Sequence, residues 1–330
     1  MLRISRGFLF QFLLLGGVSV AGAATLPSEC GSGTYLRLVS VNSAASLSSA
    51  LANAKAGDLI KMANGLYKGN FVAPTSGTST NKITLCGAKS AILDGSTLNS
   101  GYTFHLKGSY WQLVGFSVTR GKNAIVLDRA RYNLLSKLTV YNTGNEAIHL
   151  RTFSSNNIVE SCDVSKTGMV TPAYGEGIYI GSAYSNWCTY TNCDPDKSDN
   201  NKIRKNRVYG TYAEPIDIKE GTTGTLIEGN ALDGSALKGV NAADSWIDVK
   251  GNNVIVRDNK GSNSGNVLLD GYQTHVVKTG WGQNIVFDGN TASVNADGYG
   301  IFISNSKDVT IKCNNTISGA SKGLSNQNCD

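Results

Sequence analysis

The sequence is short of charge and of residues that favour helices. Only 16% of its 330 residues are Asp, Glu, Lys or Arg, against roughly 25% in an average soluble domain. Glutamate occurs seven times, whereas glycine occurs 38 times and asparagine 32 times. Because glycine and asparagine are poor helix formers, this composition argues against a helical bundle, a coiled coil or a doubly wound α/β sheet. The 41% hydrophobic content argues against disorder, which leaves a β protein with Gly and Asn turns.

Long apolar runs are lacking beyond the N-terminus. Arg3 and Arg6 precede an apolar stretch over residues 7–20, and small residues follow it. This pattern predicts a secretory signal peptide over residues 1–23, and hence a secreted, extracellular protein with a single mature domain over residues 24–330. The stretch is short for a membrane span and no comparable one follows, so we expect no membrane insertion.

Clustered positive charge is lacking too. Removing Arg3 and Arg6 from a net charge of +6 leaves +4, and no Lys/Arg cluster with interleaved aromatic residues occurs. We therefore expect no nucleic-acid partner. A mildly basic secreted surface suits an acidic polymer.

Seven cysteines remain after the predicted signal peptide, and a secreted protein can form disulfides. The predicted pairs are Cys188 with Cys193, Cys313 with Cys329, and Cys30 with Cys86. The odd count leaves one thiol, and Cys162 is predicted to be buried. Because no CxxC occurs and there are only three histidines, structural cysteines are favoured over a thiolate metal site.

A short strand-like unit recurs along the chain. Its copies cover residues 124–127, 147–150, 177–180, 215–218, 246–249 and 300–303, with a looser copy at 267–270. Each is followed by a second strand-like segment, and most of these segments reach an asparagine. The asparagines are Asn206, Asn230, Asn259, Asn290 and Asn314, at intervals of 24, 29, 31 and 24 residues. This period predicts an all-β, single-stranded, right-handed parallel β-helix with a ladder of inward asparagines.

The ends and interruptions of the repeat fit a solenoid. Apolar residues at helical spacing over residues 43–56, followed by Gly57, predict a short helix that caps the first coil. Longer segments at residues 167–174, 183–200 and 234–243 interrupt the repeat. Long insertions on a regular scaffold usually serve a binding face.

Aligning the repeats coil by coil predicts columns of outward side chains. One column contains His149, Tyr179, Asp217, Asp248 and Phe302, the next contains Arg151, Lys219 and Lys250, and a third, before the strands, contains Glu146, Glu176 and Glu214. Three of seven glutamates would thus lie on consecutive coils about 4.8 Å apart, where like charges repel. Stacked acids with interspersed lysines indicate a hard cation held by oxygen ligands, with a lysine nearby.

A groove with these residues on a secreted solenoid suits an acidic polysaccharide. β-Elimination across a uronic acid needs a cation to neutralise the sugar carboxylate and a base to remove the C5 proton. A lysine whose pKa is lowered by neighbouring positive charge can be that base. Glycoside hydrolysis needs two carboxylates flanking the bond, and the same acids would supply them. The residues alone leave both reactions open.

Four further segments carry a resemblance to a known family, namely residues 56–60, 64–67, 82–85 and 93–95. They resemble the opening coils of secreted β-helix polysaccharide lyases. The chain is most similar to polysaccharide lyase family six, the chondroitinase B and alginate lyase group, and more loosely to the family nine pectate lyases. The Asn-Thr-Asp and Gly-His-Gly motifs of polygalacturonases are missing, which argues against a hydrolase.

In family six, a glutamate calcium ligand precedes the lysine base by five residues, and an arginine lies on the next coil. Here Glu214 precedes Lys219 by five residues, and Lys250 occupies the position of the arginine. The resemblance implies Lys219 as the base, Lys250 as the partner that stabilises charge or assists proton transfer, and Glu214 as a Ca²⁺ ligand. Tyr212 stands where the family has a second glutamate. If calcium binds, the other carboxylates that would hold it are Asp217, Glu220, Asp248 and Glu176.

We therefore expect a secreted monomeric polysaccharide lyase that acts on a uronic-acid-containing polysaccharide, with Ca²⁺ as cofactor. The residues expected to contact substrate are His149, Arg151, Tyr179, Glu176 and His275. Two alternatives on the same scaffold are a glycoside hydrolase and a uronate epimerase. A third, from another class, is a non-catalytic carbohydrate-binding β-helix.

Overall fold

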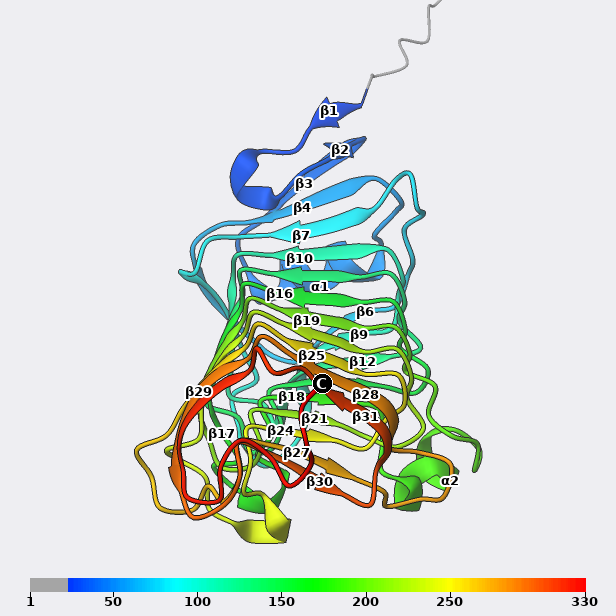
Figure 1. The fold of residues 1–330 in the computed structure, drawn as a ribbon. Helices are drawn as coiled ribbons and strands as arrows, with labels where there is room; N and C mark the ends of the chain where they lie inside the picture. The colour runs from blue at the N-terminus through cyan, green and yellow to red at the C-terminus, as the bar shows by residue number, and fades with distance from the viewer. Residues whose placement is uncertain (1–22) are drawn as a thin grey trace, which may run out of the picture.

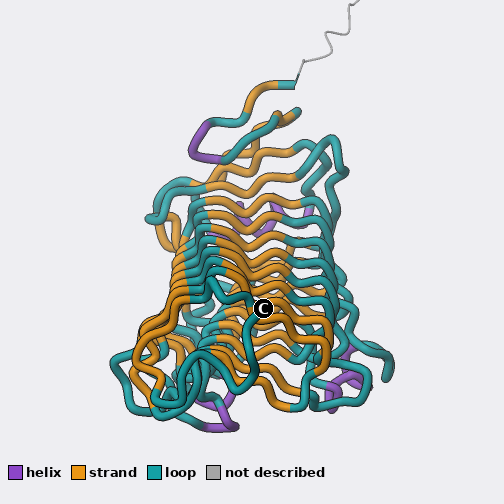
Figure 2. The backbone as a smooth tube through the Cα atoms, viewed as in Figure 1, coloured by secondary structure: helices purple, strands orange, loops and turns teal. Residues whose placement is uncertain are grey.

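The computed structural model describes residues 23–330 as a parallel β-helix (Figures 1 and 2). The predicted signal peptide lies, except for its last residue, outside the described residues. Successive coils stack so that strands from one coil pair in parallel with strands of the next, which forms three sheets of eleven, ten and nine strands. The predicted all-β solenoid is confirmed, and no helix in the described part is long and apolar enough to cross a membrane.

Sheet 1 is the eleven-stranded sheet, and it contains the second strand-like segment of each repeat. It consists of β3 (Arg37–Val41), β4 (Asp58–Met62), β7 (Ile83–Cys86), β10 (Trp111–Val114), β13 (Leu134–Ser136), β16 (Ile158–Glu160), β19 (Lys202–Arg204), β22 (Leu226–Glu228), β25 (Ile255–Arg257), β28 (Gln283–Asp288) and β31 (Lys307–Ile311).

Sheet 2 has ten strands and follows the asparagine turns; the sequence did not reveal it as a separate sheet. It consists of β5 (Gly65–Lys68), β8 (Ala91–Asp94), β11 (Ser117–Thr119), β14 (Thr139–Tyr141), β17 (Asp163–Thr167), β20 (Arg207–Thr211), β23 (Ala231–Asp233), β26 (Lys260–Ser262), β29 (Thr291–Ala296) and β32 (Thr316–Ala320).

Sheet 3 has nine strands and contains the repeated unit that revealed the solenoid. It consists of β6 (Phe71–Ala73), β9 (Tyr102–Leu106), β12 (Asn123–Asp128), β15 (Ile148–Arg151), β18 (Ile178–Ile180), β21 (Ile216–Ile218), β24 (Ile247–Val249), β27 (Tyr272–His275) and β30 (Ile301–Ser304). The looser copy predicted at residues 267–270 is wrong, because the strand of that coil is β27. Tyr272 takes the inward position that Ile247 holds on the coil before, so an aromatic ring interrupts the aliphatic pattern.

The remaining elements lie at the N-terminus and in loops. They are the hairpin β1 (Ala24–Thr25) and β2 (Thr34–Tyr35), the helices α1 (Ala44–Ala52) and α2 (Trp187–Tyr190), and the 3₁₀ turns η1 (Ser28–Cys30), η2 (Pro172–Tyr174), η3 (Tyr184–Asn186) and η4 (Val240–Ala242). The predicted helix over residues 43–56 is present but shorter. Ser43 caps its N-terminus by accepting the Ser46 amide, and Leu47 and Leu51 face the core.

A ladder of buried asparagines runs through the turn between sheets 1 and 2. Asn206, Asn230, Asn259 and Asn290 each donate to the side-chain oxygen of the next asparagine at 2.9–3.0 Å. The last member is Asn315, so the prediction of Asn314 is wrong by one residue, and Asn314 is exposed. Cys162 aligns with this ladder, since its amide donates to the side chain of Asn206.

All three predicted disulfides are confirmed. Cys30 pairs with Cys86, Cys188 with Cys193, and Cys313 with Cys329. Within the described chain the free thiol is Cys162, which is buried as predicted.

Candidate active site

The outward face of sheet 3 carries the predicted columns. Tyr179 pairs in register with Asp217, Asp217 with Asp248, and Asp248 with Gln273, which the sequence alignment missed. Phe302 follows Gln273. The column was predicted correctly apart from this extra member, which the misplaced strand had hidden.

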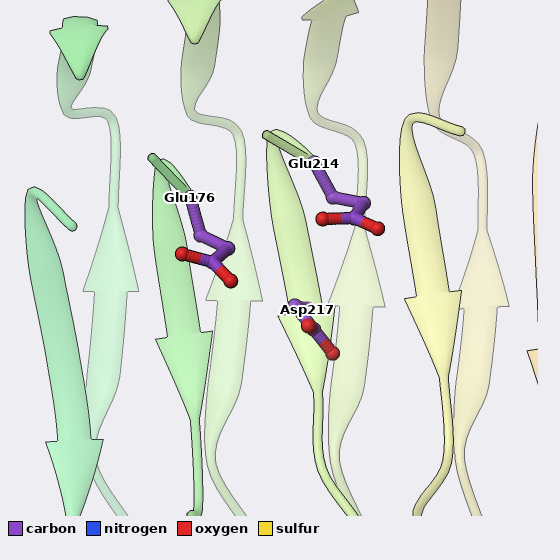
Figure 3. Close-up of side chains that lie close together, drawn as sticks. All are labelled: Glu176, Glu214 and Asp217. Carbon is purple, nitrogen blue, oxygen red and sulfur yellow. The ribbon is translucent and has the colours of Figure 1, made fainter. Parts of the chain in front are cut away.

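Glu176, Glu214 and Asp217 form an acidic triad: the two glutamates lie just before β18 and β21, and Asp217 lies within β21 (Figure 3). Each residue offers a carboxylate oxygen, and the three oxygens lie within 4.8 Å of one another. Burial together with the charge of Asp217 raises the pKa of Glu214 to about 8. Burial and the charges of neighbouring acids raise the pKa of Glu176 well above its ordinary value. The triad therefore has to take up positive charge, as protons or as a cation.

Two lysines lie beside the triad. The Nζ atom of Lys219 lies 2.6 Å from one oxygen of Asp217, and Nζ of Lys250 lies 3.0 Å from the other. Lys250 also forms an ion pair with Asp248. Burial lowers the pKa of Lys219, but the charges of Asp217 and Glu176 outweigh it and raise the pKa overall. The expected lowering of a lysine pKa by neighbouring positive charge is thus wrong for the free site.

His275 extends the chain of ion pairs to the following coil. Its Nδ1 atom lies 2.8 Å from an oxygen of Asp248. Burial lowers the pKa of His275, but the hydrogen bond to Asp248 outweighs it and raises the pKa. From Lys219 through Asp217, Lys250 and Asp248 to His275, the side chains form one connected network on three coils.

Earlier coils carry His149 and Arg151. The His149 ring contacts Tyr179 edge-on at 4.4 Å between ring centres, and its Nε2 donates to the carbonyl of Gly181. Burial and the charge of Arg151 lower the pKa of His149 to about 3, so the ring is neutral at pH 7. Arg151 donates from Nε and Nη2 to the carboxylate of Asp128.

Two cavities follow this face. One of about 650 Å³ is lined by Arg151, His149 and Tyr179, and another of about 420 Å³ by the triad, both lysines and His275. The three loops predicted to serve a binding face all reach these cavities, through Tyr174, Tyr190 and Asn241 respectively.

The structure brings together ten of the eleven predicted site residues. Glu220 is the exception, because its side chain turns to the neighbouring loop and accepts the amide of Tyr184 at 2.6 Å. Asp248 is engaged by Lys250 and His275 rather than by the triad. Glu176, expected either at the substrate or as a calcium ligand, lies with Glu214 and Asp217. The sequence also missed residues that flank the site, namely Tyr102, Asp128, Tyr190, Asp270 and Gln273.

The chain is similar to known β-helix proteins. The family model described as Pel9A-like, right-handed β-helix region matches residues 37–167. The crystal structure of an alginate lyase from Paenibacillus sp. str. FPU-7 is similar to the chain with a TM-score of 0.83 and 38% identity. The alignment covers 89% of this chain and 99% of that one.

Two further solved structures share the fold at low identity. Pectate lyase Pel9A is 16% identical, with 86% of this chain and 79% of that one covered and a TM-score of 0.64. The periplasmic alginate epimerase AlgG is 14% identical, with 80% and 60% covered and a TM-score of 0.52. At these identities the likeness concerns the fold alone. No curated protein sequence matches the chain.

Proposed function

Because the chain belongs to the family of β-helix polysaccharide lyases that includes the Paenibacillus alginate lyase, we propose that it cleaves a uronic-acid-containing polysaccharide by β-elimination. The name of that relative makes alginate the first substrate to test. One observation carries the proposal: the partly exposed Lys219 stands between an acidic triad and the aromatic ring of Tyr179, and it lines a cavity over sheet 3. The three disulfides are consistent with an extracellular protein, and we propose that it is secreted and acts as a monomer.

The acidic triad fits a hard divalent cation in its donor chemistry. Its three carboxylates are the oxygen ligands that Ca²⁺ prefers. One oxygen of Glu176 is buried without a hydrogen-bond partner among the described residues. With all groups ionised, the triad and Asp248 carry four negative charges against the two of Lys219 and Lys250. We propose Glu176, Glu214 and Asp217 as the protein ligands, in place of the set that included Glu220 and Asp248. A bound Ca²⁺ would supply positive charge that neutralises a sugar carboxylate.

The proton chemistry falls to residues of the chain itself. In β-elimination a base removes the C5 proton, the C4–C5 double bond forms, the C4–O4 bond breaks and the leaving oxygen takes a proton. We assign the base to Lys219, whose Nζ lies 5.1 Å from the centre of the Tyr179 ring. Burial and the charge of Asp217 raise the pKa of Tyr179, so its hydroxyl stays protonated and can protonate the leaving oxygen. Lys250 holds Asp217 and balances charge.

The base role has one requirement that the free site does not meet. Asp217 favours the ammonium form of Lys219, whereas a base must be neutral. Lys219 therefore has to release its proton once substrate is bound and the charge of Asp217 is engaged elsewhere. This requirement predicts activity that rises with pH on the acid side of its profile.

Ultraviolet absorbance tests the reaction, because a lyase leaves an unsaturated uronyl end and a hydrolase does not. The purified protein is incubated with alginate, pectate, glucuronan and chondroitin sulfate, with Ca²⁺ or with a chelator. We expect absorbance to grow with alginate and Ca²⁺, and Lys219→Ala to lower the rate by about 10²–10⁴-fold. Full activity of that variant would refute the assignment of the base. Lys202→Ala is the matched control, because Lys202 is exposed on sheet 1, away from the site.

An epimerase would share the first proton transfer but would not break the chain. It would change the uronate composition of alginate, seen by nuclear magnetic resonance, with no absorbance gain and no shortening. A hydrolase would shorten the chain without absorbance. These outcomes separate the reactions on one substrate.

A further inference from the structure

The groove over sheet 3 is divided into two halves of opposite charge. The half over β18–β27 is acidic. Its cavity of about 420 Å³ is lined by six carboxylates, namely Glu176, Glu214, Asp217, Asp244, Asp248 and Asp270. Only Lys219, Lys250 and His275 oppose them there. Asp244 and Asp270 lie beyond the triad and share the amide of Gln273, which donates to both at 2.8 and 3.0 Å.

The half over β9–β15 is basic. It contains the cavity of about 650 Å³ and a neighbouring cavity of about 360 Å³. The basic side chains that line them are His105, Lys107, Lys122, Arg129 and Arg151. The acids in this half are already engaged: Asp128 accepts from Arg151, and Glu146 accepts from Asn123. Lys107, Lys122 and Arg129 are exposed.

Arg151 is the basic side chain that its neighbours hold most firmly in the basic half. It is 7% exposed, and its guanidinium carbon lies 4.3 Å from the centre of the Tyr190 ring and 5.2 Å from that of Tyr102. Nε donates a hydrogen bond to Asp128, and Nη2 donates to Asp128 and to the hydroxyl of Tyr102. Nη1 makes no hydrogen bond to any described residue. A fixed guanidinium with free donors suits a carboxylate.

We propose that the polyuronate chain is held on one side of the cleavage point, over the basic half, with Arg151 binding a uronate carboxylate. This inference rests on the proposed function. Anionic sugars gain attraction from Lys107, Lys122, Arg129 and Arg151, whereas Asp244 and Asp270 repel them. The acidic half contributes the chemistry at Lys219 and little affinity for the sugars beyond it.

Binding by an inactive protein tests the proposal. Lys219→Ala protein is titrated calorimetrically with saturated mannuronate oligosaccharides of increasing length, at low and high salt. We expect affinity to grow with length and to fall with salt. Each of Lys107→Glu, Lys122→Glu and Arg129→Glu should weaken binding of the long oligomers about threefold to tenfold. Arg151→Gln should weaken it by about tenfold or more. Lys202→Glu, the same charge change on sheet 1, should leave it unchanged.

Asp244→Asn removes a charge in the acidic half and serves as the comparison for the basic-half variants. It should change the affinity for the oligosaccharides less than twofold. Unchanged affinity in the basic-half variants, or a larger change in Asp244→Asn, would overturn one-sided binding. In the active protein, the basic-half variants should raise KM for the polymer more than they lower kcat, and Asp244→Asn should leave KM within twofold of the wild type. If the active protein cleaves no uronate polymer and the inactive one binds none, the proposed function itself fails. If cleavage persists without dependence on the basic half, only the present inference fails.

Discussion

The Nζ atom of Lys250 lies 3.0 Å from a carboxylate oxygen of Asp217 on the preceding coil. Lys250 also pairs with Asp248, so it holds two buried acids, whereas among the described residues Lys219 forms an ion pair with Asp217 alone. The two lysines occupy the same column of sheet 3, but because their neighbours differ, their roles differ. Lys250 is the centre of the ion-pair network, and Lys219 is at its edge.

Lys250→Ala should therefore destabilise the fold more than Lys219→Ala. Removing Lys250 breaks its ion pairs with two buried acids and leaves Asp248 with His275 alone and Asp217 with Lys219 alone. Breaking a buried ion pair by removing one partner costs up to about 3–5 kcal/mol. Lys219→Ala keeps Asp217 paired with Lys250 and should cost less. Chemical denaturation of both variants measures the difference. Equal losses of unfolding free energy would contradict the structural role of Lys250.

Calcium should raise the melting temperature of the protein. A ligand that binds only the folded state stabilises it by about 2.7 kcal/mol at a hundredfold excess over Kd. The double variant Glu176→Gln/Glu214→Gln should lose this gain, and it should be more stable than the wild type in chelator, because two buried acids no longer repel. Glu228→Gln, on sheet 1, serves as the control, since its partner is the surface residue Arg257. Scanning calorimetry with Ca²⁺ and with chelator measures both effects, and an equal gain in the double variant would exclude the triad as the site.

The fold was predictable because every coil of a solenoid has the same packing requirements. Each coil must place aliphatic residues inward at the same two positions, so one alignment located most of sheet 3 and the column of Asp217 and Asp248. The prediction failed where a residue of another type satisfied the same packing. Tyr272 fills an isoleucine position, and the strand was placed at residues 267–270 instead.

The site was less predictable, because a strand register does not determine where a side chain beyond the strand turns. Glu220 follows Lys219 in sequence, yet it serves the loop amide of Tyr184. Tyr190 reaches Arg151 from the short helix α2, in an inserted segment that no repeat constrains. Glu176 was identified with the correct column, but its approach to Asp217 depends on the distance between coils.

Acid should destabilise the protein in part through His149. Its pKa is about 3 in the fold, mainly because of burial, against 6.5 in the unfolded chain. Between pH 6.5 and about 3 the unfolded state therefore binds a proton that the folded state does not, so the unfolding free energy falls as pH falls. The slope from this group is at most about 1.4 kcal/mol per pH unit. In His149→Gln, which keeps a donor for Gly181, the fall between pH 6.5 and pH 4 should be shallower. Denaturant unfolding at each pH measures it, and parallel curves would show that His149 does not contribute.

The neighbouring residues Asn314 and Asn315 test the register of the asparagine ladder. The Asn315 side chain accepts from both the amide and the Nδ2 of Asn290, at 2.9 Å each, and Asn290 is fully buried. Asn315→Ala would leave the Asn290 amide and one of the two Nδ2 hydrogens without an acceptor, because the other Nδ2 hydrogen bonds to Val256. An unsatisfied buried group costs about 1–3 kcal/mol. We expect a loss of about 2–4 kcal/mol of unfolding free energy. Asn314 bonds to Asp288 and Gly289 at the exposed surface, where water can replace it. Asn314→Ala should cost less than about 1 kcal/mol, and a larger loss there than in Asn315→Ala would place the ladder at Asn314.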